Sequence, residues 1–206
     1  MHRKNVFTAG LPLGAASQVL ILLHGRGSHA QDILSLSAYL RVDEFALLAP
    51  QAANHTWYPF SFLAPPAQNE PWLSSALTLI DDIVEEVITA GLLSEKIYFT
   101  GFSQGACLTL EYTARKARRW GGIVAFTGGL IGDKIYPENY CGYFAGTPIF
   151  IGSSDPDLHV PVERVGLTAS LLSGMGAAVT RKLYPGMGHT IHEDEITQAN
   201  KVLTGS

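Results

Sequence analysis

The 206-residue sequence has few charges, few cysteines and no long apolar run. Charged residues make up 16% of it and the formal net charge is −4. No basic excess is therefore present to neutralise phosphates, and we expect no nucleic-acid partner. Two cysteines do not build a disulfide framework, and the longest apolar run, residues 19–23, is too short to cross a bilayer. These absences predict a cytoplasmic protein with reduced thiols and without stable membrane insertion.

The sequence does contain the material for a large core, because 47% of its residues are apolar. We expect one domain over residues 1–206. Strands are predicted at 19–23, 45–49, 97–100, 123–126, 149–151 and 179–184, and helices at about 30–40, 73–90, 104–118, 162–175 and 193–204. Residues 51–72 are expected to form a long loop. This alternation is typical of an α/β fold with a mostly parallel central sheet and helices on both faces, whose functional loops follow the carboxyl ends of the strands.

The segment Gly101-Phe102-Ser103-Gln104-Gly105 fits the pattern G-x-S-x-G, directly after a predicted strand and before a predicted helix. In this pattern a sharp turn lifts the serine hydroxyl clear of the sheet, and glycines are needed where side chains would clash. The turn also aims the N–H of Gln104 at a bound carbonyl oxygen, at the positive end of the helix. Ser103 is therefore the predicted nucleophile.

A serine hydroxyl is a weak nucleophile and needs a base, which in this fold follows an acid in the chain. His189 follows the strand at 179–184 in a glycine-rich loop and is the predicted base; His192 is the alternative. Two carboxylates, Asp155 and Asp157, follow the strand at 149–151, and either could hold the imidazole in one tautomer. We expect the other one to shape the turn through local backbone contacts.

An acyl-transfer site also needs a second backbone donor for the oxyanion, and we assign it to the N–H of Arg26 in the loop at 24–27. The side chain of Arg26 could meet an anionic substrate or only solvent. The loop at 54–66 is rich in aromatics, which could line an acyl pocket, form a lid or pack onto the core. The predicted substrate contacts are His24, Gly25, Trp57, Tyr58, Phe60 and Met187.

Together these residues resemble the phospholipase/carboxylesterase family, which includes the acyl-protein thioesterases. The resemblance covers nearly the whole chain and rests on the segments 24–27, 50–52, 57–58, 101–106, 155–161 and 186–189. It implies an α/β-hydrolase fold without a separate cap domain. It also implies a carboxylesterase, lysophospholipase or thioesterase-type serine hydrolase that needs no metal or other cofactor and acts on a small-molecule ester or thioester. The implied residue roles agree with those above, including the oxyanion donors Arg26 and Gln104.

The chain departs from the family pattern at three places. Two extra residues separate the acidic segment from Val160-Pro161, so that counting from Gly152 selects Asp155 whereas counting back from Pro161 selects Asp157, which we favour. Pro59 stands where the family commonly has Asp, and Arg26 replaces the usual leucine. The last two departures leave the choice of substrate open. In particular, they leave open whether long lipidated proteins are substrates.

Two other functions fit parts of the sequence. A metal-dependent hydrolase could draw its ligands from His24, Asp155, Asp157, His159, His189 and His192, although no His-Glu-x-x-His pattern is present. A non-catalytic ligand-binding protein could use the same fold, since a fold does not determine a function. The sequence leaves open the acyl chain, the leaving group and whether the protein forms a homodimer.

Overall fold

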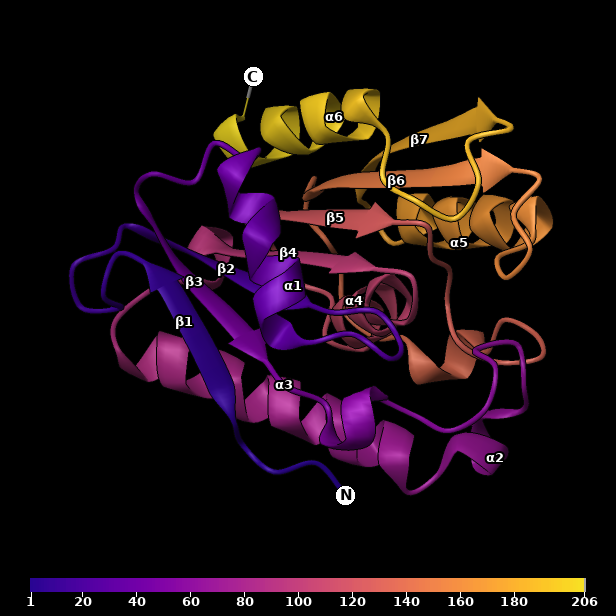
Figure 1. Cartoon of the computed structure of the whole chain (residues 1–206), viewed down its shortest axis with the longest axis horizontal. Helices are drawn as coiled ribbons and strands as arrows, with labels where there is room; N and C mark the ends of the chain where they lie inside the picture. Colours follow the sequence, from indigo (N-terminus) through magenta and orange to yellow (C-terminus); the bar gives the residue numbers. More distant parts are fainter. Residues whose placement is uncertain (206) are drawn as a thin grey trace.

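A seven-stranded sheet forms the centre of the molecule in the computed structural model, which describes residues 1–205 (Figure 1). Its strands lie in the order β1-β3-β2-β4-β5-β6-β7. Their bounds are β1 Val6–Gly10, β2 Gln18–Leu23, β3 Phe45–Pro50, β4 Ile97–Phe102, β5 Gly122–Phe126, β6 Pro148–Asp155 and β7 Ala178–Pro185. Only β1 runs antiparallel to its neighbour, and the other pairs are parallel. The predicted mostly parallel sheet is therefore present.

The continuous apolar run of β2 follows from its place in the middle of the sheet. It pairs with β3 on one side and β4 on the other, and its side chains from Val19 to Leu23 are fully buried. Because side chains alternate along a strand, Leu20 and Leu22 enter one core cluster while Val19 and Ile21 enter the other. A strand buried on both faces needs apolar residues at every position.

Helices cover both faces of the sheet. Those on one face are α3 Trp72–Thr89, α4 Gln104–Arg115 and α5 Val162–Gly174, and those on the other are α1 Ala30–Leu34 and α6 Glu193–Thr204. The short helices are α2 Pro66–Asn69, η1 Ser35–Ala38, η2 Ala53–His55, η3 Ser94–Lys96 and η4 Pro137–Asn139. None of the helices described within residues 1–205 has both the length and the apolar character that crossing a bilayer requires.

The structure differs from the predicted elements at a few places. Strand β1 was not predicted, because it is a half-exposed edge strand without a clear alternation of apolar residues. The helix predicted at 30–40 is divided between α1 and η1, and the one predicted at 104–118 ends at Arg115. The long loop at 51–72 contains η2 and α2.

The parallel strands bring four loops to one edge of the sheet. Strands β2, β4, β6 and β7 all end there, and the segments that follow them are 24–27, 103–104, 156–161 and 186–192 (Figure 1). Residues that lie more than 150 positions apart in the sequence are therefore neighbours in space, at the edge where α/β sheets place their sites.

Candidate active site

Ser103 lies at the turn between β4 and α4. Its backbone has a conformation that residues other than glycine rarely adopt. Its φ is 55° and its ψ is −117°, and its N–H donates to the carbonyl of Phe126 at 2.9 Å. A Cβ added to Gly101 would collide with the backbone of Gly105, and one added to Gly105 would collide with the carbonyl of Leu23. Both glycines of the pattern are therefore required by close backbone approach, and the turn holds the hydroxyl away from the sheet.

The imidazole of His189 contacts this hydroxyl. Its Nε2 lies 2.8 Å from the Oγ of Ser103, although the two residues are 86 positions apart. The loop that carries His189 is held in place by the N–H of Gly188, which donates to the Oγ of Ser154 at 2.9 Å. The ring also packs against Phe102, with 5.1 Å between the ring centroids. The loop and the neighbouring ring together orient the imidazole toward Ser103.

The carboxylate of Asp157 contacts the other nitrogen of the same ring, with 2.9 Å between Oδ2 and Nδ1 of His189. Its second oxygen accepts the backbone N–H groups of His159 and Val160 at 2.7 and 2.9 Å. Burial by itself raises the pKa of Asp157. The hydrogen bonds from His189 and from the two backbone groups outweigh that effect, so the pKa lies below its ordinary value. An ionised carboxylate, whose side chain is fully buried, therefore faces Nδ1 of His189.

The alternatives considered from sequence lie elsewhere. The side chain of Asp155 is exposed, and it is the backbone carbonyl of Asp155 that contacts the histidine loop, by accepting the N–H of Gly186 at 3.0 Å. The expectation that the spare carboxylate shapes the turn is wrong, because Asp157 makes both sets of contacts. His192 caps α6, where its Nδ1 accepts the N–H of Asp194.

Two backbone N–H groups beside Ser103 remain without an acceptor inside residues 1–205. One belongs to Gln104, the first residue of α4. The N–H groups in the first turn of a helix have no carbonyl of a preceding turn to bond. The other belongs to Arg26 in the loop after β2. The side chain of Gln104 is occupied, since its Oε1 accepts the N–H of Trp57 at 2.9 Å and its Nε2 donates to the carbonyl of Tyr58 at 2.9 Å. The backbone N–H groups of these two residues are therefore free to donate to a developing oxyanion.

The guanidinium of Arg26 binds the aromatic loop. It donates to the carbonyl of Pro59 at 2.9 Å and to that of Phe60 at 2.6 Å, and it lies 6.0 Å from the ring centroid of Tyr58. These contacts were not expected from sequence, where the side chain was weighed as meeting an anionic substrate or only solvent. The side chain joins the loop at 24–27 to the loop at 57–63.

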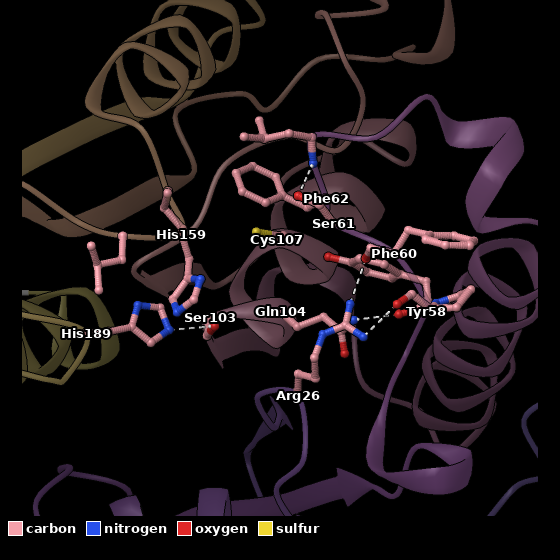
Figure 2. A pocket seen from close by; sticks show the side chains of 14 residues that line it. Arg26, Tyr58, Phe60, Ser61, Phe62, Ser103, Gln104, Cys107, His159 and His189 are labelled. Carbon is pink, nitrogen blue, oxygen red and sulfur yellow. Dashed lines mark hydrogen bonds between the residues drawn. The ribbon is translucent and has the colours of Figure 1, made fainter.

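A cavity of about 550 Å³ opens beside Ser103 (Figure 2). The predicted contacts Tyr58 and Phe60 line it, as do Arg26, Gln104 and His189. The other lining residues are Pro59, Ser61, Phe62, Leu63, Cys107, Leu158, His159 and Val160. Figure 2 shows His189 and His159 on one side of the cavity and Tyr58, Phe60 and Arg26 on the other, with Ser103 and Gln104 between them. The aromatic loop thus supplies one wall.

Four of the predicted substrate contacts do not line the cavity. His24 and Trp57 are fully buried, and the Nε1–H of Trp57 donates to the carbonyl of His24 at 2.8 Å. Burial lowers the pKa of His24. Its Nδ1 lies 2.8 Å from the carbonyl oxygen of Gly25, and its Nε2 accepts the N–H of Ala52 at 3.1 Å. The ring therefore joins the loop at 24–27 to the segment that follows β3. Gly25 packs against Ser103, and Met187 lies outside the lining.

Sequence reasoning missed several residues of the cavity, and some of them left a signal. Leu158 and His159 come from the stretch that holds two residues more than the family pattern. Cys107 lies in the first turn of α4, and its N–H donates to the carbonyl of Ser103 at 3.0 Å, so its place four residues after the nucleophile was a signal that it lies nearby. Burial raises the pKa of the Cys107 thiol to about 12, so the group is protonated. It is a small, neutral part of the cavity wall.

The candidate metal ligands considered from sequence do not assemble. Across residues 1–205, no three side chains of His, Cys, Asp or Glu lie together in an arrangement that could hold a metal ion. Asp157 and His189 instead contact one another and Ser103. The side chains around Ser103 therefore match the donors and acceptors of acyl transfer better than a metal-ligand set.

The sequence and the fold are similar to those of known hydrolases. The profile of the phospholipase/carboxylesterase family matches residues 10–205. Acyl-protein thioesterase 1 of Saccharomyces cerevisiae is 29% identical over 208 residues, which cover 88% of this chain and 89% of that protein. Acyl-protein thioesterase 1 of Gibberella zeae is 32% identical over 124 residues. This second match spans 59% of the chain and only 53% of the length of that relative.

Solved structures match over almost the whole chain. The crystal structure of a phospholipase/carboxylesterase from Dyadobacter fermentans has a TM-score of 0.97 and 52% identity, and the match covers 98% of this chain and 97% of that one. The carboxylesterase of Bacillus cereus, at 19% identity and a TM-score of 0.80 over 98% and 94% of the two chains, shows likeness of fold alone. The predicted α/β-hydrolase fold is confirmed.

Proposed function

The chain belongs to the phospholipase/carboxylesterase family, and from this membership we propose that it hydrolyses carboxylic esters or thioesters through an acyl-enzyme formed on Ser103. The observation that supports this most directly is the line of hydrogen bonds Asp157–His189–Ser103, with distances of 2.9 and 2.8 Å. Nucleophile, base and acid are within reach of one another without any movement of the loops.

The first half of the proposed reaction forms the acyl-enzyme. Asp157 accepts the Nδ1–H of His189, which leaves Nε2 as the acceptor facing the Ser103 hydroxyl. As Oγ bonds to the acyl carbon, Nε2 takes its proton, and the carbonyl electron pair moves onto the oxygen. The backbone N–H groups of Arg26 and Gln104 then stabilise that oxyanion. When the carbonyl re-forms, the alcohol or thiol leaves with the proton from Nε2.

The second half releases the acid. A water molecule gives a proton to Nε2 of His189 as its oxygen bonds to the acyl carbon, and the bond to Ser103 then breaks. The proton on Nε2 returns to Oγ, so the enzyme is regenerated and no cofactor is consumed. The apolar wall formed by Tyr58, Phe60 and Phe62 is suited to hold the acyl chain beside the turn.

The decisive experiment combines turnover with covalent labelling. Ser103→Ala should reduce kcat/KM for an aryl butanoate roughly 10³-fold or more, as removal of a nucleophile does in other triads. It should also abolish labelling by a fluorophosphonate, in which Oγ bonds to phosphorus and fluoride leaves. Ser173→Ala is the matched control, because Ser173 is exposed on α5 and lies outside the cavity.

Near-normal turnover in a folded Ser103→Ala variant would refute the nucleophile. A wild-type protein that neither reacts with the probe nor hydrolyses any ester would instead support the non-catalytic function considered from sequence.

A further inference from the structure

The two extra residues of the acidic segment place a second imidazole in the cavity. His159 follows Leu158 in the turn that Asp157 organises, and the N–H of His159 donates to Oδ1 of Asp157 at 2.7 Å. The other oxygen of that carboxylate contacts His189. One buried carboxylate thus fixes both the orientation of the His189 ring and the position of the His159 backbone. The position of His159 is therefore tied to the geometry of the site itself.

The ring of His159 lies against the ring of His189. Their centroids are 4.9 Å apart and the planes meet at 76°, an edge-to-face arrangement. Both rings line the cavity on the side opposite Tyr58 and Phe60 (Figure 2). Within residues 1–205 neither ring nitrogen of His159 has a hydrogen-bond partner, and the residue is exposed. An imidazole carries at least one N–H donor in either protonation state, so His159 has a donor available for a ligand.

The cavity has no acidic side chain in its lining. Its ionisable lining groups are Arg26, Tyr58, Cys107, His159 and His189, and the carboxylate of Asp157 lies behind His189 with a side chain that is 0% exposed. An anion that enters therefore meets hydrogen-bond donors and one permanent positive charge, that of Arg26. A cation meets no counter-charge among the lining side chains. The electrostatic character of the cavity favours a substrate that carries negative charge.

The reaction proposed above decides which part of the substrate meets His159. The leaving group takes its proton from Nε2 of His189, so its oxygen or sulfur must lie within hydrogen-bond reach of that nitrogen. The ring of His159 is the neighbour of His189 on the cavity side. Atoms a few bonds beyond the leaving oxygen or sulfur consequently come next to His159. In the proposed reaction the acyl chain lies on the other side, toward Tyr58 and Phe60.

We propose that His159 binds the leaving group, donating a hydrogen bond to a carboxylate on it, and that the enzyme therefore prefers esters or thioesters of hydroxy or mercapto acids. This inference rests on the proposed function, because it uses His189 as the group that protonates the leaving atom.

Three butanoyl thioesters test the preference, because they share the acyl group and differ in the leaving thiol. The thiols are 3-mercaptopropanoate, which is anionic, propanethiol, which is neutral, and thiocholine, which is cationic. A thiol-specific chromogenic reagent follows all three releases in one assay. For the wild-type protein we expect kcat/KM for the thioester of the anionic thiol to exceed that for the thioester of the cationic thiol by about 10-fold. One hydrogen bond to a charged group accounts for a difference of this order. The difference should lie mainly in KM.

Variants at residue 159 test whether the ring is responsible. His159→Leu should remove most of the preference for the anionic over the cationic substrate, and the part that remains is the contribution of Arg26. His159→Gln, which keeps an N–H donor of similar reach, should retain more of that preference. Lys201→Gln removes an exposed positive charge on α6, outside the cavity, and should leave the ratio unchanged. This control separates local binding from the effect of net charge.

A wild-type ratio near one, or a His159→Leu variant that keeps the wild-type ratio, would overturn the proposal. Ser103→Ala distinguishes this failure from that of the proposed function. If hydrolysis depends on Ser103 but shows no preference among the three thiols, only the role of His159 is wrong. If hydrolysis survives Ser103→Ala, the proposed function itself is wrong.

Discussion

Replacing Asp157 by asparagine should abolish most of the activity while leaving the fold intact. Oδ1 of Asp157 accepts two backbone N–H groups, at 2.7 and 2.9 Å, and Oδ2 faces Nδ1 of His189. The side-chain amide of the Asp157→Asn variant has one acceptor oxygen and one NH₂ group. Its oxygen must stay with the two backbone donors, so the NH₂ group turns toward His189.

An NH₂ group in that place reverses the tautomer of His189. Nδ1 becomes an acceptor, the ring proton moves to Nε2, and Nε2 then donates toward Ser103 instead of accepting its proton. A ring in this tautomer cannot act as the base. The corresponding change in a well-studied serine protease reduces kcat by about 10⁴-fold, which corresponds to about 5.5 kcal/mol of transition-state stabilisation. We expect a loss of roughly 10³- to 10⁴-fold here, because both backbone contacts of Oδ1 hold the amide in the unfavourable orientation.

Steady-state hydrolysis of an aryl butanoate measures this loss, and thermal unfolding checks the fold. Asp155→Asn is the matched control, since it makes the same chemical change two residues away at an exposed side chain. It should alter kcat/KM less than about threefold, as surface substitutions away from a site generally have small effects. If Asp157→Asn kept activity within tenfold of wild type, or if Asp155→Asn produced the large loss, the assignment of the acid would be refuted.

Two further predictions concern the side chains of Arg26 and Glu195. Arg26→Leu removes both contacts to the carbonyls of Pro59 and Phe60 but keeps the backbone N–H. KM for the aryl butanoate should therefore rise about fivefold, with a smaller change in kcat. A fall in kcat larger than the rise in KM would contradict the role of the side chain in holding the aromatic loop. Burial raises the pKa of Glu195 to about 7, above its unfolded value, so the folded state binds the extra proton and wild-type stability should fall as pH rises from about 4.5 through 7. In Glu195→Gln, urea unfolding should show that fall reduced by up to about 3 kcal/mol, and an unchanged pH dependence would refute it.

Much of the fold was predictable because the signals are local. The uninterrupted apolar run of β2 indicates a strand buried on both faces, and its side chains do enter two separate clusters. The apolar spacing of α3 predicted a helix at 73–90, and the structure has Trp72–Thr89. Strand β1 had no such signal, because its side chains are half or fully exposed and its place depends on pairing with β3.

The predictions for the site divide in the same way. The turn around Ser103 is visible in the sequence because close backbone approach demands both of its glycines. The pocket was less predictable. Trp57 and Tyr58 are adjacent in one aromatic loop, yet only Tyr58 lines the cavity, and Trp57 is buried beside His24. Aromatic residues suit a core and a pocket wall equally well, so composition alone does not separate the two.

By itself, the sequence determined the order of strands and helices, the strained turn at Ser103 and the glycine-rich loop that carries His189, since each depends on residues adjacent in the chain. The spacing to Val160-Pro161 favoured Asp157 but left Asp155 open, and the tertiary structure decided which carboxylate faces the imidazole. Asp155 and Asp157 lie in the same short segment, but only the packing of the loop after β6 against the loop after β7 aims Asp157 at a ring 32 residues away. The same packing brought His159 into the cavity. Contacts of this kind depend on how distant segments of the chain meet, and no local pattern of residues records that.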